Sequence, residues 1–170
     1  TEDLQEKTLN SIFHLQHLAK NLKSAFQVFG VSYSKALVQN YLSESHQQMK
    51  STLSELPLGD TESSLTLAND TRIRVHIELT GEKILIDFNG TSTSNSINMT
   101  DSATFGACFG ALSGVLDQSP LINAGTFQIL EVRTPSGTFL NAKYPAPTFM
   151  GMTEGVGLTA NVVLQTLGQI

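Results

Sequence analysis

The chain has 170 residues, of which 40% are hydrophobic, and this is enough for one domain with a buried core. Only 15% of the residues are charged and the formal net charge is −5. We therefore expect no nucleic-acid binding and no membrane attachment, because both need clustered Lys and Arg. The sequence has no apolar run of about 18 residues, no visible signal peptide and one cysteine, which together predict a cytoplasmic protein.

Two helices are predicted at the N-terminus. Residues 3–29 carry apolar side chains at steps of three and four, which indicates one apolar face, and Gly30 is placed to end that helix. A second helix is expected over roughly 34–56, with Ser32 or Ser34 as its N-cap and Pro57 at its end. Together they predict a helical hairpin over residues 1–56. The first stripe consists of Leu4, Ile12, Leu15, Ala19, Leu22, Phe26 and Phe29.

Residues 57–71 are interpreted as a polar connector, after which the hydrophobic period changes to two. Residues 72–79 and 83–88 alternate apolar and polar side chains on either side of a tight turn at 80–82, which predicts a β-hairpin. A strand is predicted over 127–133 and a type I turn over 134–137, and residues 138–142 could pair back onto that strand. Two prolines exclude a helix or a central strand over 143–149.

Two further helices are predicted, over 101–117, with Thr100 or Asp101 as the cap, and over 155–168. The first carries Gly106, Gly110 and Gly114 on one face, and each costs about 1 kcal/mol relative to alanine. We therefore expect another backbone to approach that face closely. The fold class is α+β: an N-terminal helical hairpin followed by a mostly antiparallel sheet packed with two further helices, in which residues 57–170 form the α+β unit.

Few side chains by themselves indicate a catalytic or metal-binding site. His14 and His17 share a side of the first helix, but a metal would need further ligands, so all four histidines are interpreted as solvated. Cys108 lies among apolar residues and is expected to be buried. The chain has no nucleophile elbow and no nucleotide-binding loop, and the Gly-rich stretch at 151–157 lacks the basic residue of a P-loop. Asp87 has two interpretations. Residue chemistry favours the first, in which its side chain caps the following loop. In the second, Asp87 and Asn89 lie at the rim of a functional site.

Several ordered stretches resemble one family. "GEKILIDFNGTS" is similar to its Asp-Phe-Ser/Asn-Gly-Thr/Ser signature, and "SIN" at 96–98 to the Ile-Asn that follows. "PLINAGTFQILEVRTPSGTFLNAKYPAP" resembles its Asn-x-Gly, Pro-x-Gly-x-x-Leu-Asn and Pro-Ala-Pro run, and residues 2–30 resemble its Asp-Leu-x-x-Gln helix. The family is the hydantoinase B/5-oxoprolinase B-type subunit, which includes N-methylhydantoinase B and the large subunits of acetone and acetophenone carboxylases. The resemblance covers essentially the whole chain.

The resemblance implies a function. Family members act with an A-type, actin-like ATP-binding partner, which uses ATP-Mg to activate a cyclic amide or a ketone enolate by phosphorylation. The B-type subunit then takes part in hydrolysis of 5-oxoproline, hydantoins or lactams, or in carboxylation of ketones. We expect this chain to be a segment of such an ATP-dependent hydrolase, and the full subunit to be a homo-oligomer. The alternatives are a noncatalytic scaffold or interaction domain and a segment of a ketone carboxylase.

B-type subunits are much longer than this chain, which the resemblance places in their interior, as one domain excised from a longer subunit. Their metal-binding His and Asp residues would precede Thr1, so no metal ligand is assigned here, no cofactor is expected on this segment, and the isolated chain is expected to be inactive. The candidates for a catalytic role are Asp87, Asn89, Asn98 and Asn123. The other signature positions, expected to be structural, are Gly90, Gly125, Pro135, Gly137, Asn141, Pro145 and Pro147.

Overall fold

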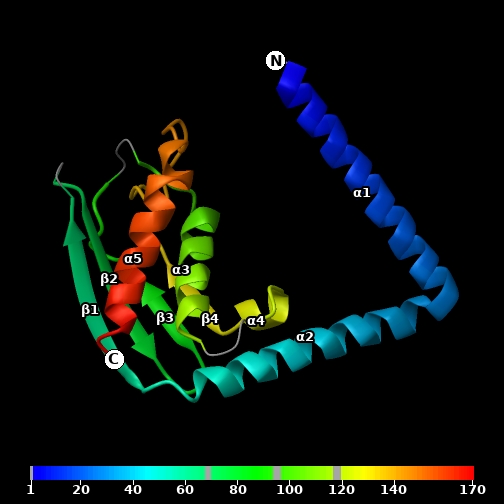
Figure 1. Cartoon of the computed structure of the whole chain (residues 1–170), viewed down its shortest axis with the longest axis horizontal. Coiled ribbons are helices and arrows are strands. Elements are labelled where there is room, and N and C mark those ends of the chain that lie inside the picture. The colour runs from blue at the N-terminus through cyan, green and yellow to red at the C-terminus, as the bar shows by residue number, and fades with distance from the viewer. Residues whose placement is uncertain (1, 68–69, 94–96, 117–119) are drawn as a thin grey trace. The chain divides into compact units, whose positions relative to one another are not determined.

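The computed structural model describes residues 2–67, 70–93, 97–116 and 120–170 (Figure 1). The chain divides into two compact units, Thr1–Ser43 and Glu44–Ile170, which we call the helical unit and the sheet unit. The boundary lies inside the second helix, earlier than residue 56, where the predicted hairpin ends. Within the described residues, no helix combines the length and the apolar character that a bilayer-spanning segment needs.

The two predicted N-terminal helices are present. Helix α1 spans Glu2–Phe29 and α2 spans Val31–Leu53, with Gly30 between them. Gly30 has φ +79° and its amide donates to the carbonyl of Phe26 at 2.9 Å, as expected of a glycine that ends a helix. The predicted caps for α2 are wrong, because Ser32 and Ser34 lie inside the helix, and Ser34 Oγ donates back to the Gly30 carbonyl at 2.9 Å.

The sheet unit contains one four-stranded sheet in the order β1-β2-β3-β4. Its strands are β1 (Gly59–Thr66), β2 (Arg72–Leu79), β3 (Ile84–Asp87) and β4 (Leu130–Arg133). The β1–β2 and β2–β3 pairs are antiparallel and the β3–β4 pair is parallel, so the sheet is mostly antiparallel, and the predicted hairpin at 72–88 is confirmed. The connector predicted at 57–71 is wrong, because most of it forms β1. The inward positions of β1 are Thr61, Ser63 and Leu65, which give little hydrophobic contrast with their exposed neighbours.

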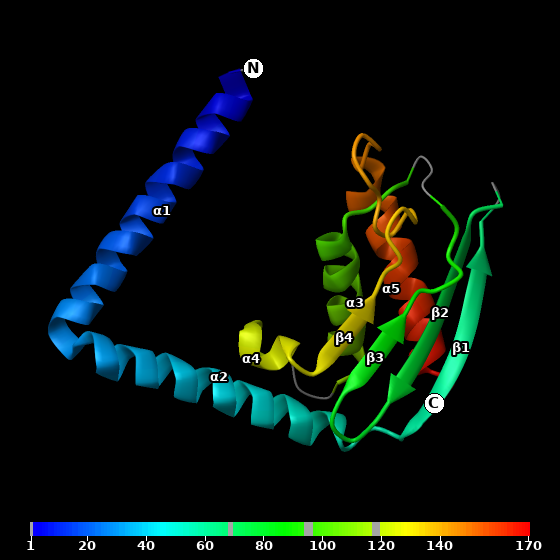
Figure 2. The ribbon, with the colours of Figure 1, turned by 180° about the vertical axis from the view of Figure 1, so that it is seen from behind.

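Helices α3 (Asp101–Val115) and α5 (Glu154–Leu167) pack against each other and cover one face of the sheet (Figure 1). Thr100 is the N-cap of α3, as predicted, and accepts from the amide of Ala103 at 3.2 Å, while the predicted last residue of α3, 117, lies outside the described residues. The fully buried side chains of the core include Ile73, Val75, Ile77, Ile84, Ile86, Phe88, Leu112 and Phe139. In the view from behind, the opposite face of the sheet carries no described helix of this unit (Figure 2).

The segment after α3 departs from prediction in two ways. Residues 124–127 form the short helix α4 (Ala124–Phe127), so the strand predicted over 127–133 is limited to β4. Residues 138–142 do not pair with β4. Instead the amide of Phe139 donates to the Ser92 carbonyl at 3.2 Å, and the amide of Ala142 donates to the Met99 carbonyl at 3.0 Å. These bonds connect Ser92 and Met99 to the segment that contains Phe139 and Ala142.

The turn predicted at 134–137 is shifted by one residue. The amide of Thr138 donates to the carbonyl of Pro135 at 3.3 Å, so the turn runs over 135–138. Gly137 has φ +89° and occupies the third position, where a type II turn requires a positive φ. The turn is therefore type II rather than type I, and it explains why a glycine stands at this position.

Candidate functional site

The open face of the sheet carries an ordered set of polar side chains. The register places Glu62, His76, Asp87 and Arg133 in one row that crosses all four strands. The neighbouring row consists of Asp60, Glu78, Leu85 and Glu131. Asp87 faces the opposite charge of Arg133, whereas Asp60 and Glu78 are like charges opposite each other, which is unfavourable across a sheet. Antiparallel sheets commonly leave such a polar face in water, so the rows by themselves do not indicate catalysis.

Arg74 lies on the same face of β2, opposite Ser64 of β1. Its guanidinium is bidentate on Glu62, with Nε–Oε1 at 2.7 Å and Nη2–Oε2 at 2.5 Å, and its Nη1 donates to the carbonyl of Asn89 at 3.2 Å. The hydrogen bond from Arg74 lowers the pKa of Glu62, and the same bond raises the pKa of Arg74. The guanidinium thus connects the edge strand β1 to the turn that follows β3.

Asp87 and Asn89 form a turn that is closed by their own side chains. Asp87 Oδ1 accepts from the amide of Asn89 at 2.8 Å, and its Oδ2 accepts from Asn89 Nδ2 at 3.2 Å. Gly90 follows with φ +87°, and a Cβ there would come within 3.0 Å of Arg74 Cδ. This geometry supports the interpretation of Asp87 as a loop cap, because both of its oxygens hold the following turn.

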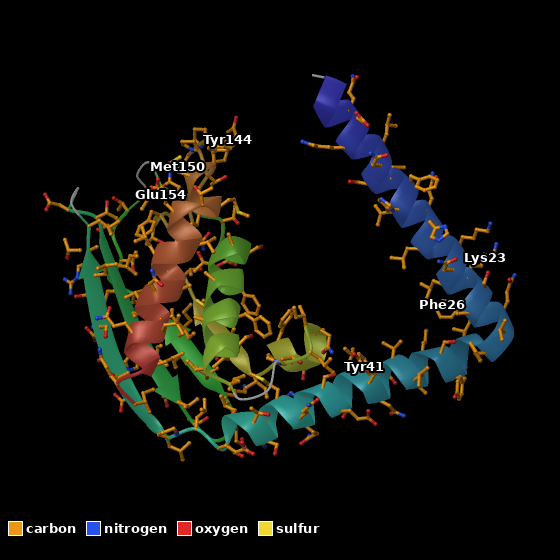
Figure 3. The ribbon with its side chains drawn as sticks, viewed as in Figure 1. Lys23, Phe26, Tyr41, Tyr144, Met150 and Glu154 are labelled. Carbon is orange, nitrogen blue, oxygen red and sulfur yellow. The ribbon has the colours of Figure 1, made fainter. Side chains whose placement is uncertain are left out.

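Asn98 lies elsewhere, inside the sheet unit. Its side chain is only 1% exposed, and its Nδ2 donates to the carbonyl of Pro147 at 3.0 Å, so it fastens the Pro-Ala-Pro segment. The backbone at Asn98 is itself crowded, because a Cβ on Gly151 would overlap its carbonyl oxygen. Gly151 lies in the short helix η1 (Met150–Met152), which leads into α5, and sequence patterns had assigned no packing role to this stretch. Figure 3 labels Tyr144, Met150 and Glu154 around this junction.

Asn123 is the N-cap of α4. Its Oδ1 accepts from the amides of Gly125 and Thr126 at 2.9 and 3.2 Å, and its Nδ2 donates to Ser45 Oγ at 2.9 Å. A small cavity of about 10 Å³ lies here, lined in part by Ser45 and Thr126, and its volume suits about one water molecule. Asn141 likewise donates to the carbonyl of Thr134, at 3.0 Å.

The candidate residues therefore do not converge on one site. Asp87 and Asn89 lie together on the open face of the sheet, whereas Asn98 and Asn123 hold two other segments. Among the described residues, no group of three or more His, Cys, Asp or Glu side chains is arranged to hold a metal ion. In the structure Asp87, Asn98 and Asn123 each bond to backbone groups, and Asn89 Nδ2 donates to Asp87.

Two other features bear on chemistry. Cys108 is buried, as predicted, and burial raises the pKa of its thiol to about 12, which keeps it from acting as a thiolate nucleophile. An apolar cavity of about 230 Å³ lies at the C-terminal end of α5, lined by Leu56, Pro57, Leu79, Val115, Leu164, Leu167, Gly168 and Ile170. The described residues that line it include no titratable side chain.

Sequence patterns did not predict that Glu62 and Arg74 form an ion pair, or that Gly151 packs closely against another segment. The alternation in residues 72–79 did place Arg74 and His76 on one face, but Glu62 was assigned to a connector and so had no position in the sheet. A signal for Gly151 existed in the Gly-rich stretch 151–157, but its partner, the backbone of Asn98, is distant in sequence.

Comparisons with known proteins agree with one another. A sequence model of the family described as hydantoinase B/oxoprolinase matches residues 11–170. The B subunit of a putative D-/L-hydantoinase from Pseudomonas sp. (strain NS671) is 25% identical over 161 residues, which are 84% of this chain and 27% of that protein. An uncharacterised protein of Methanocaldococcus jannaschii is 31% identical over 97 residues, 56% of this chain and 17% of its own length. The chain thus spans about a quarter or less of these relatives.

A solved structure shares the fold. The crystal structure of an ATP-dependent caprolactamase from Pseudomonas jessenii superimposes with a TM-score of 0.78 at 21% sequence identity. The match covers 88% of this chain and 27% of the caprolactamase chain. At that identity the likeness concerns the fold.

Proposed function

Because the chain belongs to the hydantoinase B/oxoprolinase family, we propose that it is a segment of the B-type subunit of an ATP-dependent cyclic-amide hydrolase. The observation that carries the proposal is the family match over residues 11–170. The relative described as the B subunit of a hydantoinase and the fold shared with an ATP-dependent caprolactamase support it. The substrates would be 5-oxoproline, hydantoins or related lactams, and the compartment would be the cytoplasm.

The proposed reaction needs two components. An A-type partner would bind ATP-Mg and transfer a phosphoryl group to activate the amide. Addition of water, release of phosphate and cleavage of the ring C–N bond would then give ADP, phosphate and the ring-opened product, which is an amino acid from a lactam and an N-carbamoyl amino acid from a hydantoin. A divalent metal, if the B-type subunit uses one, would be held outside this segment, since the described side chains do not gather to bind it.

Within that enzyme the segment would act mainly as a scaffold. Asp87 holds the turn after β3, Asn98 fastens the Pro-Ala-Pro segment and Asn123 caps α4. The second candidate function is therefore a noncatalytic interaction domain, and the observation that favours it is that each of these side chains is bonded to the chain's own backbone.

The test is an assay of the longer B-type subunit that carries this segment, together with its A-type partner, on 5-oxoproline, hydantoin and caprolactam. We expect ATP-dependent ring opening, with ADP and ring-opened product released in equal amounts, and no turnover by the 170-residue chain alone. The product carries a free amine when the substrate is 5-oxoproline or caprolactam, and is an N-carbamoyl amino acid when the substrate is hydantoin. Ring opening without ATP, or by this chain alone, would contradict the proposal. ATP-dependent consumption of bicarbonate and a ketone would assign the carboxylase function instead.

Substitutions of Asp87 in the same longer subunit distinguish a structural role of this residue from a role in the active site. We expect Asp87→Ala to lower the free energy of unfolding by about 1 kcal/mol, because it removes the acceptor of the Asn89 amide. Asp87→Asn keeps an acceptor oxygen and should retain most of the stability, with kcat little changed in both variants. A loss of kcat at an unchanged melting temperature would instead place Asp87 in the site.

A further inference from the structure

Thr126, in the short helix α4, has a buried hydroxyl group without a hydrogen-bond partner among the described residues. The residue is only 1% exposed. By contrast, the buried hydroxyls of Thr104, Thr159 and Thr166 each donate to a backbone carbonyl at 2.6 to 2.8 Å. Burial removes the water that would otherwise solvate a hydroxyl, so native proteins seldom leave such a group unpaired. The Thr126 hydroxyl therefore requires a further partner.

The small cavity beside Thr126 has room for such a partner. Its volume is about 10 Å³, and it is lined by Thr126 from α4 and by Ser45, Gln48 and Thr52 from the C-terminal part of α2. All of these residues belong to the sheet unit, so the cavity lies within one unit. About 10–15 Å³ is enough for one water molecule, provided that two to four polar groups can bond to it.

The lining of the cavity supplies hydrogen-bond donors and acceptors but no charge. It contains three hydroxyl groups and the side-chain amide of Gln48, and the other described lining residues, Met49, Pro120 and Leu121, are apolar. The hydroxyl of Thr52 donates to the Gln48 carbonyl at 3.1 Å, and because a hydroxyl oxygen has two lone pairs, it can still accept a hydrogen bond. Divalent cations prefer several oxygen ligands that include carboxylates. The volume and the uncharged lining therefore favour a water molecule over an ion.

We propose that one ordered water molecule binds in this cavity and bridges α4 to α2. It forms one hydrogen bond with Thr126 Oγ1, and its other hydrogen bonds go to the polar side chains of α2 that line the cavity. A direct bond already joins the two helices, from Asn123 Nδ2 to Ser45 Oγ at 2.9 Å. The water adds a second link between them and completes the hydrogen bonding of Thr126. This site does not depend on the proposed reaction.

The alternative is that the Thr126 hydroxyl has no partner at all. Replacing an unpaired buried hydroxyl by an apolar group of the same shape is neutral or stabilising, because the cost of burying the hydroxyl disappears. If a water molecule is bound, the same replacement removes a hydrogen bond and leaves the water with fewer partners, so it is destabilising. Valine has nearly the shape of threonine, with a methyl group in place of the hydroxyl. The sign of the stability change in Thr126→Val therefore distinguishes the two cases.

The first test is urea unfolding of the parent chain and of Thr126→Val. We expect the midpoint of the transition to fall in the variant while its slope stays the same, which indicates a loss of stability alone. The matched control is Thr104→Val, because the Thr104 hydroxyl donates directly to the Leu140 carbonyl at 2.6 Å, and its midpoint should also fall. A midpoint for Thr126→Val that equals or exceeds that of the parent, together with a fall for Thr104→Val, would overturn the proposal.

The second test needs no substitution: a crystal structure of the parent chain in which ordered water molecules are visible. We expect a water oxygen about 2.5–3.0 Å from Thr126 Oγ1, with at least one further hydrogen bond to a side chain of α2. In crystals of Thr126→Val the same water should be absent or displaced. A parent structure without a water at this distance, or with a direct bond from Thr126 Oγ1 to a protein group, would overturn the proposal.

Discussion

Gly151 and Gly155 are both under tight steric constraint. A Cβ on Gly151 would overlap the carbonyl oxygen of Asn98, and a Cβ on Gly155 would come within 2.7 Å of Met99 Cγ. The start of α5 therefore lies directly on the 97–99 segment, with Thr159 Oγ1 in contact with Met99 Sδ at 3.4 Å. Gly151 faces backbone atoms, which cannot move aside as a flexible side chain can, whereas the atoms nearest to Gly155 belong to the Met99 side chain.

Gly151→Ala is expected to lower the free energy of unfolding by about 1–3 kcal/mol, or to displace η1, because the added methyl group has no space. The measurement is urea unfolding followed by circular dichroism, in which the midpoint should fall. Gly157→Ala is the matched control, since a Cβ there meets nothing within 4 Å, and it should be neutral or stabilising. Equal effects of the two substitutions would refute the packing argument.

Glu62→Gln should make the stability of the sheet unit less dependent on pH. The pKa of Glu62 is lowered in the folded state by its hydrogen bond to Arg74, so its stabilising effect is present above the unfolded pKa, near 4.5, and is lost as the pH falls through the folded pKa. The parent chain should be more stable than Glu62→Gln at pH 6, and in urea titrations the difference should shrink as the pH falls through the folded-state pKa of Glu62. Glu55→Gln, at an exposed position outside the sheet, is the control.

Among the secondary-structure elements, α3 has two different faces. One face is buried in the core of the sheet unit and contains Ala107, Cys108, Ala111 and Leu112. The other face is exposed and contains Gly106, Gly110 and Gly114. A Cβ at any of these three glycines meets nothing within 4 Å. The close backbone approach that their spacing predicted is therefore not made by the described residues of this chain, and the glycines lower the stability of α3 without a compensating contact.

Gly110→Ala is accordingly expected to raise the free energy of unfolding of the isolated chain by up to about 1 kcal/mol, because it improves the helix propensity at an open position. A thermal scan should show a melting temperature higher by a few degrees, on the order of what 1 kcal/mol produces in a domain of this size. Ala107→Gly, on the buried face of the same helix, should have the opposite effect. A decrease for Gly110→Ala would show that this face is covered.

Across the whole molecule, the two units differ in how they are held together. The sheet unit buries a contiguous core between the sheet, α3 and α5, while the helical unit exposes many of its large apolar side chains. Local stability follows such differences, since regions with few buried apolar contacts open at lower free energy than a packed core.

Amide hydrogen exchange should show this difference directly. We expect the amides of β2 and β3 to be the slowest to exchange, because opening them disrupts the core. The amides of α1 should exchange much faster, because few of its apolar side chains are buried. Exchange of the α1 amides as slow as that of β2 and β3 would contradict this expectation.

Local sequence patterns were sufficient to predict those elements whose two faces differ strongly in polarity. The alternation in residues 72–88 predicted β2 and β3, and the three- and four-residue steps predicted α1 and α5. The cap at Thr100 and the break at Gly30 were also predictable, because each depends on a few adjacent residues. Periodicity and capping are local properties, so the residues of the element itself contain the information.

Contacts between segments that are distant in sequence could be identified only from the tertiary structure. Strand β1 has Thr61 and Ser63 on its inner face, so its place depends on pairing with β2 rather than on its own pattern. The parallel pairing of β4, the contact of Gly151 with Asn98 and the bond from Arg74 to Glu62 likewise join residues that are separated along the chain. Asp87 and Asn98 stand close together in sequence but hold different parts of the molecule, because packing, and not sequence proximity, determines which groups a side chain can reach.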